Sequence, residues 1–391
     1  MLKAGREEIE AISKIIESGA VFRYRPGGVC ETFERRLAAF LGARHVALCS
    51  SGTTALTAAL AGLGIGPGDE VLVPAHTYMA TAIAVLAVGA IPVIVDVDES
   101  IMISPDAVEN AIGPRTRAVI PVHMWGLLCD MDRLLEIGRR RNLLLVEDAC
   151  QCIGGTHRGR AAGAMGQAGA FSFNFYKNMS CGEGGAVITS DDTVARRARC
   201  MIDPCSFYWE GREDDFRPFA YPGARASELQ GAMLGPQLDR LPGQLAELRR
   251  TKARVLKAIA DLDMLTPAPN HSPEGECAIR IMLQLPDAAA ADRFAEALGP
   301  RSCVVLSRTG RHNYTEWDPI LTRQGAHHPA MNPFNFPQNA GCRMDYRKDL
   351  CPKSLEILAR TVAVYLFPYQ TDAQIESLIA SIRAAAAAAR K

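Results

Sequence analysis

Lys177 lies in a glycine-rich run whose residue types could support covalent chemistry. The run extends from Phe171 to Thr189, with Ser172 before the lysine and Gly182-Glu-Gly-Gly185 after it. A lysine in a weakly charged setting can lose its proton and form a Schiff base with an aldehyde. A lone lysine near glycines is more often a solvated surface residue, so this interpretation depends on the groups that accompany it.

An acidic segment upstream supplies a second group. Asp148 ends the apolar run 143–148, and Gln151 follows three residues later. A bare carboxylate at the end of an apolar strand is costly to bury, and ligands in open α/β sheets bind at the carboxyl ends of strands. Such an aspartate can keep the pyridine nitrogen of pyridoxal 5'-phosphate (PLP) protonated, which makes the ring an electron sink. Taken alone, Asp148 is explained equally well as a structural helix cap.

Further runs could hold the phosphate and the ring of this cofactor. Ser51-Gly52-Thr53 follows an apolar run and opens a helical pattern, and the free N–H groups and dipole of a helix start attract anions. An ordinary N-cap serine would produce the same pattern. Ser172 could donate its hydroxyl to the phosphate, and Tyr78 could lie on the face of a flat ring. A core tyrosine is the simpler explanation for Tyr78 alone.

The composition argues against several functional classes. The chain has 391 residues with 43 Lys plus Arg and 43 Asp plus Glu, so its balanced charge gives no reason to expect nucleic acid or an anionic membrane as a partner. No run approaches the roughly 20 apolar residues of a membrane span, and residues 1–20 lack the apolar core of a signal peptide. The twelve cysteines show no metal-type spacing. We therefore expect no metal site, reduced thiols and a cytoplasmic location.

The elements that would position these groups alternate between strands and helices. Strands that are apolar along their whole length, separated by helices, indicate a mostly parallel sheet covered on both faces. The predicted strands are 46–49, 70–74, 91–96, 118–122, 143–148, 169–173 and 186–189, with helices over 7–18, 30–41, 53–63 and 80–88. The last two strands flank the Lys177 loop, and the predicted fold class is α/β.

The pattern changes after a long helical region predicted over 228–259, where a hinge between two domains is expected. Two strands and three helices are predicted beyond it: 279–285, 302–306, 288–298, 352–366 and 372–388. We therefore predict a large domain over 1–245, with a helical arm over 1–20, and a smaller α+β domain over 246–391. The segment 308–350 is aromatic and rich in Pro, Asn and His. A loop of this length is more often functional than structural filler.

Eight runs in order along the chain carry a family resemblance. They are Ser51-Gly-Thr-x-Ala-Leu56, Gly68-Asp-Glu-Val-x-Val-Pro74, Gly89-Ala-x-Pro-Val93, Val122-His123, Glu147-Asp-Ala-x-Gln151, Ser172-Phe-x-x-x-Lys177 with Gly182-Glu-Gly-Gly185, Arg225-x-x-Glu-Leu-Gln230, and Cys351-Pro with Leu355-x-x-Leu-x-Arg-Thr361. Together they resemble the DegT/DnrJ/EryC1/StrS family of PLP-dependent aminotransferases, which aminate keto sugars and related polyols. The resemblance implies PLP fold type I, as in aspartate aminotransferase, with a mostly parallel seven-stranded sheet between helices.

The resemblance also implies roles for the residues above. Lys177 would form the Schiff base with PLP and move a proton between two carbons, and Asp148 would pair with the pyridine nitrogen. Tyr78 would stack on the ring, and Gln151 would lie near the ring or its 3-oxygen. The remaining cofactor-binding residues would be Gly52, Thr53 and Ser172 at the phosphate, together with Ser51 and Arg225.

The implied reaction moves an amino group from an amino acid, glutamate or glutamine, to a keto sugar, octulosonate or keto cyclitol. A histidine in place of the lysine marks the sugar 3-dehydratase branch of the family, so Lys177 favours transamination. The candidate substrate-binding residues are His123, Arg308, His312, Tyr314 and His327, although a structural histidine or a polar surface loop would look the same. The alternative is a PLP enzyme of another reaction class, such as a decarboxylase or a C–C bond-forming enzyme, on the same scaffold.

One departure from the family pattern concerns assembly. The family has Gly-x-Asn-x-Arg before Glu-Leu-Gln, and its asparagine reaches the phosphate of the neighbouring subunit, whereas this chain has Gly223 there. The fold type implies at least a homodimer with an active site shared between subunits, and we expect residues 202–220 and 223–225 to cross over. The first segment carries four residues of the types that anchor interfaces: Phe207, Tyr208, Trp209 and Arg212.

Overall fold

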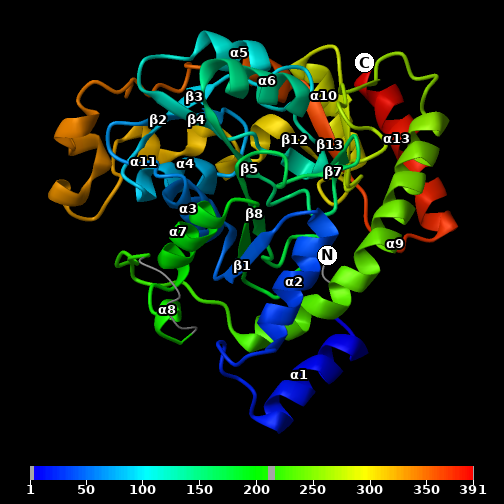
Figure 1. Ribbon diagram of the computed structural model, residues 1–391. Helices are drawn as coiled ribbons and strands as arrows, with labels where there is room; N and C mark the ends of the chain where they lie inside the picture. The colour runs from blue at the N-terminus through cyan, green and yellow to red at the C-terminus, as the bar shows by residue number, and fades with distance from the viewer. Residues whose placement is uncertain (1–3, 210–215, 391) are drawn as a thin grey trace.

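The computed structural model describes residues 4–209 and 216–390, and Figure 1 shows their arrangement. Seven strands form the large sheet: β1 (His45–Cys49), β2 (Glu70–Pro74), β3 (Ile91–Val95), β4 (Thr116–Val119), β5 (Leu144–Asp148), β8 (Ala168–Ser172) and β9 (Gly185–Thr189). Their order is β1-β9-β8-β5-β4-β2-β3. Neighbours from β8 to β3 run parallel, while β9 is antiparallel to both β8 and β1. The predicted α/β class with a mostly parallel seven-stranded sheet is confirmed.

Helices cover this sheet, as strands that are apolar along their length require. They include α2 (Val29–Leu41), α3 (Gly52–Gly62), α4 (Ala80–Ala87), α5 (Pro105–Asn110), α6 (Met131–Arg141), α7 (Asp192–Ile202) and the short α8 (Ser206–Trp209). Helix α3 packs against β8 and β9 and is covered by α7, while α5 and α6 pack on each other. Within the described ranges, none of the helices combines the length and the apolar character of a bilayer span.

The long helix α9 (Glu228–Ala258) connects the two ends of the molecule in Figure 1. It packs against α1 (Arg6–Ser18) and α2 at one end and against α13 (Asp372–Ala389) at the other. Ser227 and Gln230 form a capping box that begins α9. The predicted boundary between residues 245 and 246 falls inside this helix, and the division into two domains remains a prediction.

A second, four-stranded sheet lies in the C-terminal part. Its strands are β10 (Thr266–Pro267), β11 (Arg280–Gln284), β12 (Cys303–Val305) and β13 (Thr361–Tyr365), in the antiparallel order β10-β11-β13-β12. Helices α10 (Ala288–Leu298) and α13 pack on each other over this sheet, and α12 (Pro352–Ala359) leads into β13. A small two-stranded ribbon of β6 (Thr156–His157) and β7 (Arg160–Ala161) lies apart from both sheets in the pairing scheme.

One predicted helix was wrong in its second half. The helix predicted over 352–366 ends at Ala359, and residues 361–365 form β13, a central strand of the small sheet. The run Thr-Val-Ala-Val-Tyr is rich in β-branched and aromatic residues, which favour a strand. Pairing with β11 on one side and β12 on the other then stabilises the extended conformation over the helical pattern that precedes it.

The segment 308–350 is a series of single turns, several of them begun by proline, rather than an open loop. Its middle is bonded to the large sheet. The buried Asn339 accepts from Gly68 N at 2.5 Å and donates to Gly89 O at 2.9 Å. Arg343 pairs with Glu70 at the start of β2, and the Tyr346 hydroxyl donates to the Pro92 carbonyl at 2.7 Å.

Candidate active site

A cavity of about 580 Å³ opens beyond the carboxyl ends of the central strands, within the size range of small-molecule sites. Its walls come from the turns after β1, β2, β4, β5 and β8, and from the start of β11. The predicted residues that line it are Ser51, Gly52, Thr53, Tyr78, Asp148, Gln151, Ser172, Lys177 and His312. The parallel strands account for this convergence, because their carboxyl ends meet at one edge of the sheet.

Asp148 presents a buried carboxylate to this cavity. The Thr81 hydroxyl donates to Oδ2 at 2.8 Å, and the Cys150 backbone N–H donates to Oδ1 at 3.1 Å. Within the described ranges no lysine, arginine or histidine pairs with it. Two neutral donors hold the carboxylate in place and leave acceptor capacity for one more donor, which suits a protonated ring nitrogen.

Lys177 lies in the turn between β8 and β9. Backbone bonds from Phe175 N to Gly182 O, at 2.9 Å, and from Lys177 N to Asn174 O, at 3.0 Å, fix that turn. No carboxylate of the described residues forms an ion pair with the lysine. Burial and the Asp148 charge raise the pKa of the Cys150 thiol well above its usual range, and the nearby Lys177 charge partly offsets this rise. Lys177, Asp148 and Cys150 line the same cavity.

The start of α3 forms a cradle beside the lysine turn. The Ser51 hydroxyl accepts from Thr54 N at 3.1 Å, so it caps the helix, while Gly52 and Thr53 open the first turn. A Cβ at Gly52 would come within 2.8 Å of both Cys150 Sγ and Ser172 Cβ. Only glycine lets the helix start this close to Ser172. The first-turn N–H groups and the Ser172 hydroxyl then face one space, which fits a phosphate.

One wall of the cavity is aromatic. The rings of Tyr78 and Trp125 lie 5.4 and 5.0 Å from the His312 ring, centroid to centroid. Trp125 has a φ of 55°, which is uncommon for a bulky residue. Gln151 Oε1 accepts from Trp125 N at 3.1 Å, and the Trp125 indole N–H donates to His76 Nε2 at 3.1 Å. These bonds hold the tryptophan in its unusual conformation.

The electrostatics of this wall favour neutral imidazoles. Burial lowers the pKa of His76 to about 3. Its Nδ1–H donates to Asn313 Oδ1 at 3.1 Å, since the Asn313 amide group already donates to Leu306 O and Ser307 O. Burial also lowers the pKa of His312, and the Lys177 and Arg311 charges lower it further.

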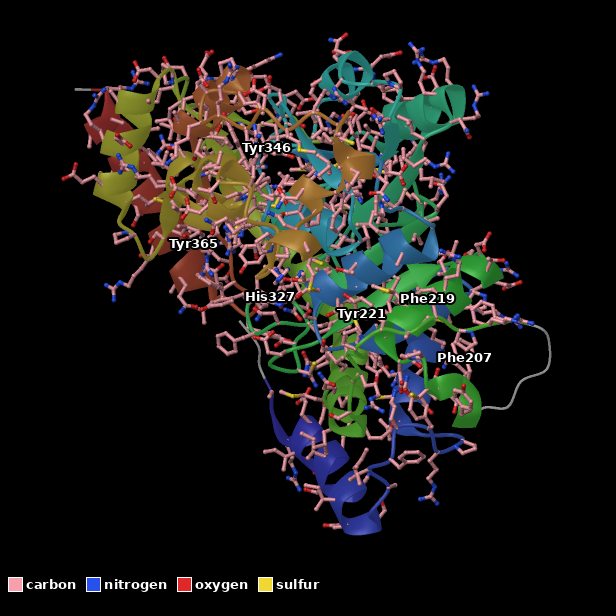
Figure 2. All side chains as sticks on the ribbon, turned by 90° about the vertical axis from the view of Figure 1, so that its left-hand side faces the viewer. Phe207, Phe219, Tyr221, His327, Tyr346 and Tyr365 are labelled. Carbon is pink, nitrogen blue, oxygen red and sulfur yellow. The ribbon has the colours of Figure 1, made fainter. Side chains whose placement is uncertain are left out.

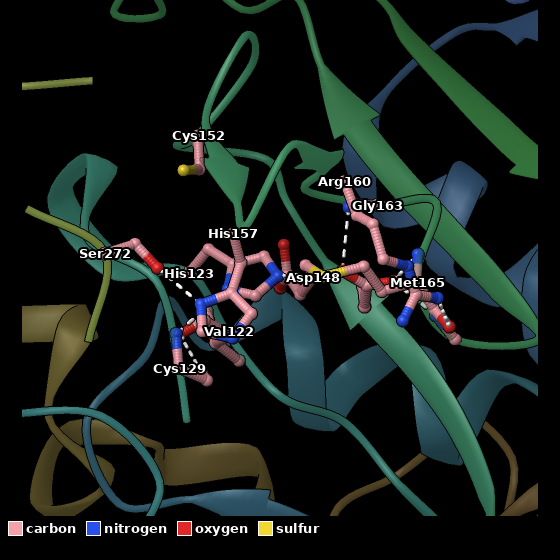
Figure 3. A network of polar contacts seen from close by, with 12 residues as sticks. Val122, His123, Cys129, Asp148, Cys152, His157, Arg160, Gly163, Met165 and Ser272 are labelled. Carbon is pink, nitrogen blue, oxygen red and sulfur yellow. Dashed lines mark hydrogen bonds and ion pairs between the residues drawn. The ribbon is translucent and has the colours of Figure 1, made fainter. Parts of the chain in front are cut away.

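His123 does not reach the cavity, although it was predicted as a substrate-binding residue. It is fully buried, and its Nε2 lies 3.0 Å from Glu147 Oε2. Its Nδ1 accepts from Cys129 N at 3.2 Å, so Nε2 carries the proton and donates to the carboxylate. Figure 3 shows the network that encloses it. His123 is therefore a structural histidine, the alternative that the sequence analysis allowed.

Three predicted residues of the segment 308–350 also lie outside the cavity. Arg308 forms a surface ion pair with Asp292 at 2.6 Å. Tyr314 is fully buried, and its hydroxyl donates to Lys348 O at 2.7 Å. His327, labelled in Figure 2, is exposed and is not among the residues that line the cavity. Their residue types were right for a polar ligand, but the turns of this segment direct them elsewhere.

Arg225 is not among the residues that line the cavity, but it lies beside the end of β1. Its backbone bridges to Cys49 at the end of β1, and its guanidinium lies 3.4 Å from Asp203 Oδ2. Gly223 has a φ of 85°, a conformation that glycine adopts readily. Figure 2 shows Phe207, Phe219 and Tyr221 on the same side of the molecule, around this segment. Arg212, one of the predicted interface residues, lies outside the described residues.

Trp125 and Arg280 are two of the cavity residues that the sequence analysis missed. Trp125 belongs to a run from which only His123 was chosen, and Arg280 opens an apolar strand far along the chain. A bulky aromatic directly before Gly126, in a turn after a buried strand, was a usable signal for the first. The signal for Arg280 was weaker: it is a charged residue directly before the run Ile281-Met-Leu-Gln-Leu285, which favours a strand.

Comparison with known proteins places this geometry in a family. The chain is 41% identical to GDP-perosamine synthase of Caulobacter vibrioides over 56% of its own length and 58% of that enzyme. It is also 41% identical to dTDP-3-amino-3,4,6-trideoxy-alpha-D-glucose transaminase of Streptomyces venezuelae, over 67% of the chain and 69% of the relative. The matched part thus spans little more than half of the first relative and about two thirds of the second.

A solved structure extends the likeness to almost the whole chain. S. venezuelae DesV, solved in complex with a ketimine intermediate, matches with a TM-score of 0.74 and 30% identity over 97% of this chain and 94% of its own. The family model described as the DegT/DnrJ/EryC1/StrS aminotransferase family matches residues 3–305. With Lys177, Asp148 and the start of α3 meeting in one cavity, the chain belongs to this aminotransferase family.

Proposed function

We propose that the protein is a PLP-dependent aminotransferase that moves an amino group from an amino acid to a keto sugar, octulosonate or keto cyclitol. The observation that carries the proposal is the convergence of Lys177, Asp148 and the Gly52–Thr53 helix start in one cavity. Family membership and relatives named as an amino-sugar synthase and a transaminase support it. Glutamate or glutamine is the proposed donor.

The residues present fit PLP. Gly52, Thr53 and Ser172 would hold the phosphate, Asp148 would accept a hydrogen bond from the pyridine nitrogen, and Lys177 would bind the aldehyde carbon. When bound, the cofactor would supply an electron sink for the reacting carbon. Lys177 Nζ would then be free to move a proton between donor and acceptor carbons.

Tyr78 and Gln151 are assigned less directly. Tyr78 is exposed and lines the cavity, and its ring is tilted by 52° to the ring of His312. Gln151 uses its carbonyl oxygen to hold Trp125. Its amide group is the part that would reach the ring or its 3-oxygen.

We further propose a homodimer with a shared active site. Tyr176 lies one residue from Lys177 on the cavity rim and is 83% exposed, and Ile9 on α1 is 66% exposed. Large apolar side chains exposed at a site and on a projecting helix favour cover by a second copy. Arg225, which the resemblance assigns to the cofactor, would reach the site of the second copy.

Hybrid dimers test this assembly. A Lys177→Ala chain mixed with an Arg225→Ala chain should regain part of the activity that each lacks alone, because one of the two sites is then built from intact residues. Sedimentation should give a dimer. A fully active monomer would refute the shared site.

The amino transfer is tested by its first half-reaction, in which the donor passes its amine to the cofactor. Glutamate added to PLP-loaded protein should remove the visible absorbance of the bound cofactor and yield pyridoxamine phosphate, identified by chromatography. A panel of keto sugars, octulosonates and cyclitols against the pyridoxamine form should then identify the acceptor. Release of CO₂, or a new C–C bond in the product, would instead support the alternative reaction class. The cytoplasmic location remains a prediction from the cysteine pattern.

A further inference from the structure

Arg280 is a cavity residue with an unusual environment. It is the first residue of β11, and it reaches the cavity from the four-stranded sheet rather than from the large one. Its guanidinium lies 4.4 Å from the ring centroid of Tyr365 and 5.7 Å from that of Trp125. The two rings hold the planar group and provide cation–π attraction.

Arg280 lacks a counter-ion in the part of the chain that the structure describes. Among residues 4–209 and 216–390, no carboxylate pairs with it, and its only hydrogen bond runs from NH1 to the neighbouring Ile279 carbonyl at 2.7 Å. Its Nε is buried without a partner. Burial lowers the pKa of this guanidinium to about 10, and the nearby Tyr365 hydroxyl offsets little of the effect.

Arg23, another arginine with little exposed side chain, has a partner of the kind that Arg280 lacks. Arg23 pairs with Glu34 at 2.6 Å, and that carboxylate compensates its burial. An uncompensated buried charge is costly. A cost of this kind at a cavity wall is expected where a ligand supplies the missing charge.

The geometry identifies the ligand's chemistry. Two aromatic rings lie near the guanidinium, and the described residues supply one acceptor, the Ile279 carbonyl, for its N–H groups. The planar guanidinium matches the two oxygens of a carboxylate, which it can bind through two parallel hydrogen bonds. The phosphate cradle at Gly52–Thr53 belongs to a different wall of the cavity, so the cofactor phosphate has its own site.

We propose that Arg280 binds a carboxylate of the amino acid that donates the amine. This inference rests on the proposed aminotransferase function, in which every amino-acid donor carries a carboxylate. Arg280 would orient the donor so that its amine faces Lys177, which lines the same cavity. Of the proposed acceptors, an octulosonate also carries a carboxylate, so the test measures the donor half of the reaction separately from the acceptor half.

The test compares Arg280→Gln and Arg280→Lys with wild type and with Arg301→Gln, which removes an exposed arginine from the turn before β12. Two quantities are measured in PLP-loaded protein. One is the single-turnover rate of amine transfer from glutamate to the cofactor. The other is the affinity for glutarate, which has the carboxylates of glutamate but no amine, by calorimetry. Circular dichroism and PLP affinity check that each variant folds.

We expect Arg280→Gln to weaken glutarate binding and the rate at low glutamate on the order of 10- to 100-fold, as for loss of a charge-assisted hydrogen-bond pair. Arg280→Lys should keep part of both, and Arg301→Gln should equal wild type. PLP affinity should be unchanged in all three. A larger effect with glutamate than with glutamine would place the arginine at the distal carboxylate, and an equal effect at the α-carboxylate.

Unchanged glutarate affinity and glutamate rate in Arg280→Gln would overturn the proposal while leaving the aminotransferase function intact. A defect confined to the acceptor half of the reaction would also overturn it, because the arginine would then bind the acceptor and not the donor. Failure of the wild-type protein to form pyridoxamine phosphate from any amino acid would reject the proposed function itself. If Arg280→Gln does not fold, Arg280→Lys alone decides, through its ratio of glutarate affinity to PLP affinity.

Discussion

Glu147 and Asp148 are neighbours on β5, yet they belong to two different regions of the molecule. Both are buried. Glu147 accepts from four donors: Gly163 N at 2.8 Å, Met165 N at 2.5 Å, Gly166 N at 2.5 Å and His123 Nε2 at 3.0 Å. Figure 3 shows His123, Gly163 and Met165 gathered in this closed network.

Asp148 points to the other face of the strand, because successive side chains alternate. There it has two neutral donors and borders a cavity that also holds the unpaired Lys177 and Arg280. One carboxylate has used its acceptor capacity to fix the fold, and the other has kept capacity for a ligand. Burial alone does not distinguish them, whereas the count of partners does.

Among changes to the cavity that Asp148 borders, removal of the Lys177 amine should have the largest effect. We expect Lys177→Ala to abolish turnover and the visible absorbance of the bound cofactor, because covalent catalysis through the aldehyde needs this amine. Circular dichroism should match wild type, since the side chain has no structural partner among the described residues. Full activity in the variant would remove the basis of the proposed function.

Asp148→Asn should lower the rate while some PLP stays bound. The neutral amide no longer stabilises a positive ring nitrogen, and a preorganised charge of this kind is worth on the order of 3–4 kcal/mol, or ~10²–10³ in rate. Single-turnover kinetics with glutamate measure it. Activity within a factor of a few of wild type would show that the ring nitrogen has another partner.

Glu147→Gln tests the buried network of four donors around Glu147. All four partners of this carboxylate are donors, so the new NH₂ group would face N–H groups that it cannot satisfy. We expect a loss of about 3 kcal/mol in the free energy of unfolding, measured by denaturant titration. Catalytic rate per folded molecule should change far less than in Asp148→Asn, and the opposite pattern would contradict the division between the two residues.

His76, which accepts a hydrogen bond from the cavity residue Trp125, makes stability depend on pH. Its pKa in the folded protein is about 3 because of burial, below the ordinary value near 6.5 of the unfolded chain. Its contribution to stability is therefore complete above pH 6.5 and falls as the unfolded chain takes up a proton, by up to about 1.4 kcal/mol per pH unit down to pH 3. His312 acts in the same direction.

The control for this pH effect is His76→Gln, which keeps a donor for Asn313 and an acceptor for Trp125. Between pH 5 and 6.5 its unfolding free energy should depend less on pH than that of wild type. Equal slopes would mean that His76 takes up its proton in the folded state.

Arg308→Ala should have the smallest effect. Its ion pair with Asp292 lies on the surface, where such pairs contribute at most ~1 kcal/mol. We expect stability and the keto-acceptor KM to stay near wild type. A clear rise in that KM would show that Arg308 contacts the acceptor, either after movement of the segment 308–350 or from a second copy of the chain.

The sequence predicted the parts of the site that local pattern determines. The large sheet follows from uninterrupted apolar strands, and Asp148, Ser172 and Gly52 follow from their place at strand ends. Strand β13 was missed because the helical pattern of 352–359 runs directly into it, and its pairing with β11 and β12 is a long-range effect.

Arg280 and Trp125 show why the rest of the site could not be predicted. Both depend on how the turn after β4 packs against the start of β11, more than 150 residues away in the chain. Arg308, Tyr314 and His327 were chosen by residue type, and type does not tell which way a turn directs its side chains. The number of hydrogen-bond donors around Glu147 and Asp148 likewise depends on the folded structure and cannot be derived from the sequence.

The segment 308–350 has a mechanical consequence. It leaves the small sheet after β12 and returns to it at β13, yet its middle is bonded at Asn339, Arg343 and Tyr346 to the large sheet. A rigid rotation of one sheet against the other would stretch this segment and break these bonds together. The frame around the cavity is therefore stiff, and the width of its mouth should be adjusted by the short rim turn at 174–183 rather than by the sheets.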